Sequence, residues 1–217
     1  MTTGSDAGDA GEADGVDDAV GRLGPERLLA FSDGVVAIAL TLLVLPLADL
    51  VPDRVEQGQS ALPLLTENLT LIGSFLLSFV VIGRFWMVHH QLFDRVRHTT
   101  RALVWLNLAW LLTVVVLPFP TEMAGVYRDD PFTLRFYVAT LFASSVLLSI
   151  MTVVVARAGA AGPGFRHQPT TFVTPALLLV VLATTLVWSR AGYSLLFLLF
   201  LGPLVETVLR RRIGRSG

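Results

Sequence analysis

The sequence predicts an all-α membrane protein with six transmembrane helices per subunit, and three observations carry this prediction. Hydrophobic residues make up 53% of the 217 residues, and charged residues only 15%, against about 25% in soluble domains. The mean hydropathy is +0.68. Six apolar stretches each come close to the roughly 20 residues that a helix needs to cross a hydrocarbon core of about 30 Å. Cysteine is absent, which excludes disulfides and thiolate chemistry.

The six predicted helices follow one another with short connections. They cover about residues 27–48, 69–90, 102–120, 133–156, 171–189 and 193–210. Pro25 opens the first at a position where a missing N–H costs nothing, and Pro118 and Pro120 stop or kink the third. Residues 25–212 thus form one predicted six-span domain. Residues 1–24, with six carboxylates and few large apolar side chains, predict a disordered acidic tail, and residues 213–217 a short basic tail.

The distribution of arginine predicts the orientation of these helices. The segments on the N-terminal side of the membrane hold eleven arginines, namely Arg22, Arg27, Arg95, Arg97, Arg101, Arg157, Arg166, Arg210, Arg211, Arg212 and Arg215. The opposite side holds four, namely Arg54, Arg128, Arg135 and Arg190. Because basic residues are enriched in cytoplasmic segments, we expect a multi-pass plasma-membrane protein with both termini in the cytoplasm.

The first predicted helix carries polar residues inside an apolar span. A carboxylate within a membrane costs free energy, so Asp33 marks a candidate functional site. At 100° per residue Asp33 lies about 140° from Ile38, and Ser32 is also off the face of Ile38. That face is smooth, and it comprises Phe31, Gly34, Ile38, Thr41, Leu42 and Leu45. The helix therefore presents an apolar face in one direction and polar groups to its neighbours in another.

Three polar residues on different helices lie at one predicted depth. Asp33, Arg84 and Asn107 are each about six residues, or roughly 9 Å, inside the same boundary. A carboxylate and a guanidinium at one depth should pair. The network either locks the bundle together or also serves gating or proton sensing. His89 and His90 point about 100° apart, so we expect satisfied histidines at the membrane interface and no metal site.

Three motifs resemble one known family. The stretch 27–43 reads Arg-x-x-x-Phe-Ser-Asp-Gly-x-x-Ala-Ile-x-x-Thr-Leu-Leu, residues 86–93 read Trp-x-x-His-His-x-x-Phe, and Asn107 is followed by Leu-Pro-Phe at 117–119. Together they resemble the bacterial relatives of transmembrane protein 175, a family of potassium channels. The resemblance implies a homotetramer in which the first helix lines a central pore, without a filter of backbone carbonyls.

The resemblance also implies roles for particular residues. Ile38 corresponds to the narrowest apolar ring of the pore and Leu45 to a ring one layer outward. Thr41 corresponds to a threonine implicated in selecting potassium over sodium, and Leu42 shares its layer. The polar network, structural or gating, comprises Arg27, Ser32, Asp33, Arg84, His89, His90 and Asn107. Potassium is the expected permeant ion, with no cofactor.

Other classes of function are less well supported by the residues. The chain lacks His-Glu-x-x-His, Gly-x-Ser-x-Gly and a Gly-rich phosphate loop, so we predict no enzymatic activity. The expected partners are the lipid bilayer, monovalent cations and further copies of the chain, with no nucleic acid. A secondary transporter or a proton-permeable channel for small cations stays as the alternative, since weak internal symmetry can escape a single sequence.

Overall fold

A computed structural model describes residues 24–56, 60–127, 130–160 and 172–187, and the regular elements in this part are helices. They are α2 (Pro25–Leu42), α3 (Leu45–Glu56), α4 (Ala61–Glu67), α5 (Leu69–Phe93), α6 (Arg101–Val116), α7 (Pro118–Val126), α8 (Pro131–Arg157) and α9 (Val173–Val187). Within these described ranges, four stretches are long and apolar enough to cross a membrane, namely Pro25–Pro52, Leu69–Phe93, Arg101–Val126 and Pro131–Arg157. The described part of the chain is thus helical and carries membrane-spanning candidates, as the predicted class requires.

The number of spans is confirmed only in part. The predicted helix over 171–189 is present as α9, a shorter apolar helix of 15 residues. The predicted helix over 193–210 and both predicted tails lie outside the described residues, apart from Gly24. The count of six spans therefore stays a prediction.

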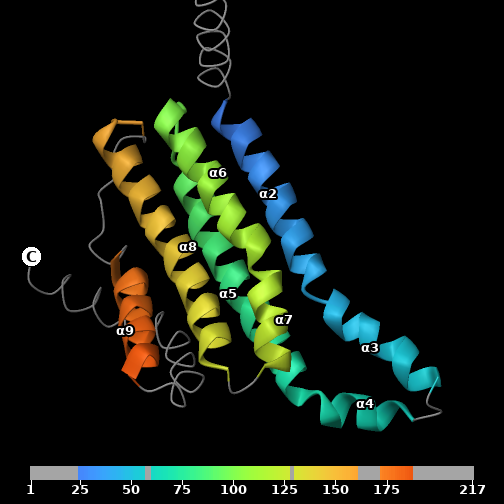
Figure 1. Cartoon of the computed structure of the whole chain (residues 1–217). Helices are drawn as coiled ribbons and strands as arrows, with labels where there is room; N and C mark the ends of the chain where they lie inside the picture. The colour runs from blue at the N-terminus through green and yellow to red at the C-terminus, as the bar shows by residue number, and fades with distance from the viewer. Residues whose placement is uncertain (1–23, 57–59, 128–129, 161–171, 188–217) are drawn as a thin grey trace, which may run out of the picture.

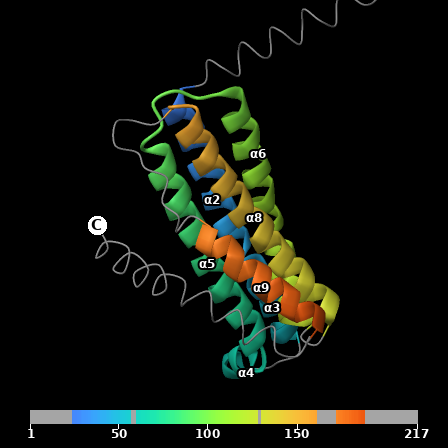
Figure 2. The ribbon, with the colours of Figure 1, turned by 90° about the vertical axis from the view of Figure 1, so that its left-hand side faces the viewer.

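The long helices run side by side and alternate in direction (Figure 1). Helix α2 packs against α5 and α6, while α8 packs against α6 and α9. Figure 2 shows α9 crossing α8 at an angle. Helices α3 and α4 extend away from the bundle at the end where α2 finishes. This arrangement leaves α2 at one edge of the described bundle.

Local sequence signals explain where the helices begin and end. Pro25 occupies the first turn of α2. The side chain of Thr100 accepts a hydrogen bond of 3.3 Å from the backbone N–H of Leu103 at the start of α6. Asp130 caps α8 by accepting bonds from the side chain and the backbone N–H of Thr133, and these bonds lower the pKa of Asp130. Gly159, with φ of 60°, follows the end of α8.

The core lies between α5, α6 and α8. Its largest fully buried side chains include Ile82, Leu103, Trp110, Leu141 and Met151. Because lipid is as apolar as these side chains, close packing rather than the hydrophobic effect must hold such helices together in a membrane. Gly125 of α7 shows how close that packing is, since a Cβ there would overlap with Leu71 of α5.

Two predicted helices are interrupted where prolines stand. The first predicted span, over 27–48, lies within the candidate span Pro25–Pro52, but its helix is interrupted, because α2 ends at Leu42 and α3 begins at Leu45. Pro46 has no N–H to offer the carbonyl of Leu42, and its ring clashes with that carbonyl in a regular helix. The third predicted helix divides at Pro118 as expected, but α7 continues beyond residue 120 to Val126.

Candidate functional site

Helix α2 has one face without cover in the single chain. Ile38 is 60% exposed and Phe31 53%, and Gly34, Thr41 and Leu42 on the same face are exposed as well. Leu45, at the start of α3, is 49% exposed. Only 17% of the most apolar window of Pro25–Pro52 is buried, against 44% for Pro131–Arg157. The six residues that the helical period places together are therefore all on an open surface, which we call the open face of α2.

The hydroxyl of Thr41 is the only hydroxyl among the six residues of the open face. Its Oγ1 donates a hydrogen bond of 2.7 Å to the backbone oxygen of Ile38, one turn earlier in the same helix. The hydroxyl proton is therefore committed to the helix backbone. A hydroxyl oxygen keeps its acceptor lone pairs when its proton is donated. Oγ1 of Thr41 can therefore coordinate a cation that reaches the exposed side of the helix.

The opposite face of α2 is fixed to the bundle by Ser32. Its side chain is fully buried, and its Oγ donates a bond of 2.8 Å to the backbone oxygen of Leu28. The same Oγ accepts a bond of 2.9 Å from Nδ2 of Asn107 on α6. Oδ1 of Asn107 lies 2.7 Å from Nε2 of His89 on α5. Ser32, Asn107 and His89 thus join three helices in one buried chain of hydrogen bonds.

The direction of each bond in this chain follows from its members. The amide nitrogen of Asn107 is the donor to Ser32, which leaves Oδ1 of Asn107 as an acceptor. Nε2 of His89 must therefore carry a proton and donate it to Asn107. Every polar atom along the chain from His89 Nε2 to the carbonyl of Leu28 has a partner, which makes the attachment of α2 specific.

The side chain of His89 is fully buried within the bundle. Its predicted position at the membrane interface stays a prediction. Helix α5 continues past the predicted end at residue 90 to Phe93, which covers the ring. The His89 ring stacks on Trp110 at a centroid distance of 4.2 Å and an angle of 7°, and on Phe93 at 4.4 Å. His89 is consequently part of the core.

Asp33 lies beside this chain and contacts α5. Its Oδ1 accepts a hydrogen bond of 2.7 Å from Nε1 of Trp86. Its Oδ2 lies 3.6 Å from Nδ1 of His90, whose Nε2 is 3.8 Å from Oδ1 of Asp94. Two carboxylates therefore flank His90, in a series that runs from the inside of the bundle toward the end of α5. This series connects α2 with the end of α5.

The remaining residues of the predicted network occupy less buried positions. Arg27 is exposed in the first turn of α2, and Arg84 is half-buried on α5. The proposed pairing of Arg84 with Asp33 stays a prediction. Among the residues that the structure describes, no group of three or more histidines and carboxylates could hold a metal ion.

Sequence reasoning missed a second polar cluster in the core. Oγ of Ser78 on α5 lies 2.8 Å from the hydroxyl oxygen of Thr121 on α7 and 2.9 Å from that of Tyr137 on α8. Thr121 in turn donates to the backbone oxygen of Leu117. The available signal was an isolated serine inside a strongly apolar helix. The cluster fixes the segment that follows the interruption between α6 and α7.

Comparisons with known proteins find similarity to one family. The model of the family of the endosomal/lysosomal potassium channel TMEM175 matches residues 27–118, which include the open face of α2 and the buried polar chain. The crystal structure of a lysosomal potassium-selective channel TMEM175 homolog from Chamaesiphon minutus superposes with a TM-score of 0.64 and 25% identity. The match covers 86% of this chain and 97% of that one. Over residues 27–118 this chain is similar to the TMEM175 family.

Several members of the TMEM175 family are similar over part of their length. A potassium channel from Streptomyces collinus is 40% identical over 105 residues, which are 48% of this chain and 50% of the relative. A potassium channel from a Chryseobacterium species is 32% identical over 134 residues, 60% of this chain and 65% of the relative. The human endosomal/lysosomal proton channel TMEM175 is 31% identical over 212 residues, 88% of this chain and 42% of the relative. The chain thus spans about half to two thirds of the bacterial relatives.

Proposed function

We propose that this chain is the subunit of a potassium-permeable channel of the plasma membrane, with both termini in the cytoplasm. One observation carries the proposal, namely the open face of α2, which leaves Ile38 60% exposed on a helix anchored from behind. Four copies arranged around an axis would bring four such faces together and cover them. The names of the bacterial relatives as potassium channels support potassium as the permeant ion.

The geometry supports conduction through a constriction made of side chains. A regular helix uses its carbonyls in its own hydrogen bonds, so α2 offers no ring of free carbonyls at Ile38. A ring of four isoleucines would be narrow and dry, and such a ring blocks ions by dewetting. Thr41 would place four hydroxyl oxygens one turn further along, followed by Leu42 and Leu45. In this proposal Ile38 sets the barrier and Thr41 contributes to the choice among cations.

The test is cation flux through the purified full chain in liposomes. With a potassium gradient, we expect flux that is faster for potassium than for sodium or caesium under matched gradients. Liposomes made without protein give the background. Flux no higher than that background, or no difference among the three cations, would contradict the proposal.

A proton-permeable channel is the second candidate, and one observation favours it. Asp33, His90 and Asp94 form a series of titratable groups with separations of 3.6 Å and 3.8 Å. The animal relatives are named proton channels. A pH-sensitive dye trapped in the same liposomes distinguishes the two, because under an imposed pH gradient, acid outside, a proton path acidifies the interior without any potassium gradient. Loss of that acidification in Asp33→Asn with potassium flux retained would assign the series to protons.

A secondary transporter differs from both candidates in its kinetics. Transport through alternating access saturates with substrate and gives no stepwise current, whereas a pore gives discrete currents in single-channel recording.

The proposed channel domain extends from residue 25 to residue 212, since all six predicted helices fall between these boundaries.

A further inference from the structure

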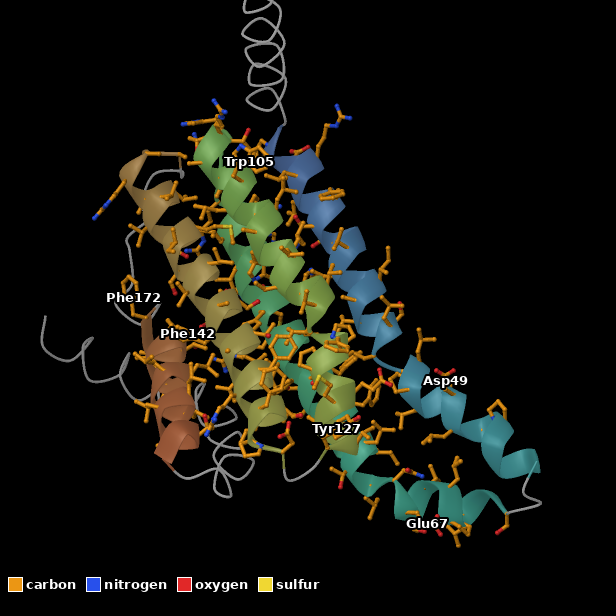
Figure 3. The ribbon with its side chains drawn as sticks, in the orientation of Figure 1. Asp49, Glu67, Trp105, Tyr127, Phe142 and Phe172 are labelled. Carbon is orange, nitrogen blue, oxygen red and sulfur yellow. The ribbon has the colours of Figure 1, made fainter. Side chains whose placement is uncertain are left out.

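Exposed arginines from separate parts of the chain gather at one end of the bundle. Arg95 and Arg97 stand in the connection between α5 and α6, and Arg157 is the last residue of α8. Arg27 and Arg101 begin α2 and α6 at the same end (Figure 1). Figure 3 shows nitrogen-tipped side chains from several elements at the end marked by Trp105. Among the described residues, the carboxylates of this end are Glu26 and Asp94, so positive charge is in excess.

The connection that carries Arg95 and Arg97 is held in place. Val96, between the two arginines, is 6% exposed and belongs to the hydrophobic core. The backbone N–H of Arg97 donates a bond of 2.8 Å to the backbone oxygen of Ala160, which is itself buried just beyond α8. Val96 therefore points inward while its two neighbours are exposed, and the bond to Ala160 brings Arg97 close to the end of α8. The backbone that carries Arg95 and Arg97 is therefore held near the end of α8, where Arg157 lies.

We propose that Arg95, Arg97 and Arg157 bind the headgroup of an anionic phospholipid. The position of the three arginines favours this partner. Arg95 and Arg97 follow α5, which ends at Phe93, and Arg157 is the last residue of α8. Residues at the ends of membrane-spanning helices lie at the depth of the lipid headgroups. The guanidinium group matches phosphate oxygens with paired hydrogen bonds. Charge complementarity thus selects anionic over zwitterionic lipid. This inference does not depend on which ion the protein conducts.

The experiment is a lipid titration of the full chain in detergent, with bound lipid counted by native mass spectrometry. The probes are phosphatidylglycerol and phosphatidylcholine of identical acyl composition. A basic residue near a charged membrane surface changes binding by about fivefold. We therefore expect Arg157→Gln to weaken phosphatidylglycerol binding about fivefold, and R95Q/R97Q/R157Q to weaken it roughly a hundredfold. Phosphatidylcholine binding should be unchanged.

A matched control separates this cluster from arginine content in general. R54Q/R128Q/R190Q removes three arginines that the sequence places on the opposite side of the membrane, and it should leave phosphatidylglycerol binding at the wild-type level. Circular dichroism and size-exclusion elution check that each variant folds, and the single variant serves if the triple variant does not. Equal binding of both lipids by the wild type would overturn the proposal. So would equal losses in both triple variants, or no loss in Arg157→Gln.

Discussion

Nδ2 of Asn107 and Oγ of Ser32, 75 residues apart in the chain, lie 2.9 Å apart in the core and tie α6 to α2. Ser32 is six residues from Ile38, and six residues at 100° each turn a helix by about 240°. The bond therefore fixes α2 from behind and determines which way the open face of α2 points. The apolar ring proposed above would need its side chains at a set distance from an axis, and this anchor would set the rotation of the helix that such a ring requires.

Ser32→Ala should destabilise the protein by about 1–3 kcal/mol, because it leaves the buried amide of Asn107 without its acceptor. The measurement is the midpoint of thermal unfolding in detergent micelles. Ser74→Ala is the matched control, since the half-buried Ser74 hydroxyl bonds only to the backbone of its own helix, at Leu71. Equal midpoints for the two variants would show that the bond to Asn107 contributes nothing.

Asp33 and Trp86 should be energetically coupled. A hydrogen bond to a charged group contributes about 1.5–3 kcal/mol, and the indole N–H of Trp86 donates to the carboxylate at 2.7 Å. In a double-mutant cycle, Asp33→Asn and Trp86→Phe should together destabilise the protein by less than the sum of the single effects. The control cycle replaces Trp86→Phe with Trp105→Phe, an exposed tryptophan on α6, and should be additive.

A second double-mutant cycle, with Arg84 in place of Trp86, tests the predicted pair of Asp33 with Arg84. Arg84 is half-buried and the side chain of Asp33 is 35% exposed, so removing one partner should cost less than the about 3–5 kcal/mol of a fully buried ion pair. Asp33→Asn and Arg84→Gln should each reduce the yield of assembled oligomer. The double variant should be less impaired than additivity requires. Strict additivity in this cycle, with coupling retained in the cycle of Asp33 and Trp86, would show that the Asp33 carboxylate interacts with the Trp86 indole and not with Arg84.

The two faces of α2 could be predicted because a helix has one fixed period. The position of Asp33 in depth followed from span length in the same way. The hydrogen bond from Trp86 to Asp33 could not be predicted in this way, because depth does not specify the direction in which a side chain points around its helix. Arg84 and Trp86 lie at similar depths on α5 but differ in direction by about 200°. The burial of His89 depends on its stacking with Trp110, 21 positions away, a tertiary contact without a local signal. The interruption at Leu42 did have a signal in Pro46.

The orientation of the chain can be tested by cysteine labelling, because the natural sequence has no cysteine. A cysteine at Ser60, between α3 and α4, should react with a membrane-impermeant maleimide added to intact cells. A cysteine at His98, in the connection between α5 and α6, is the control and should react only after the cells are opened. The reverse pattern would place both termini outside.

Thr41→Ala should leave conduction intact and reduce the preference for potassium over sodium. The substitution removes the only hydroxyl of the open face of α2, whose oxygen stays available while its proton binds the backbone of Ile38. The measurement is the reversal potential of reconstituted protein with potassium on one side and sodium on the other. Thr184→Ala on α9, whose hydroxyl likewise bonds its own helix at Val181, is the control and should not shift that potential.

Ile38→Asn should raise the single-channel conductance and weaken the discrimination among monovalent cations. A ring of isoleucine side chains excludes water, and an amide at the same position holds water and lowers the barrier to a hydrated ion. The matched control is Ile150→Asn, which makes the same chemical change at a position that is 41% exposed. Ile150 belongs to α8, which lies away from α2 in Figure 1. Single-channel recording in a planar bilayer should show larger, less selective steps for Ile38→Asn and wild-type steps for Ile150→Asn. A transporter would instead lose saturable transport without any leak. A polar side chain in the narrowest ring of the pore must change the passage of ions. Wild-type conductance and selectivity in Ile38→Asn would therefore mean that the open face of α2 does not line the pore.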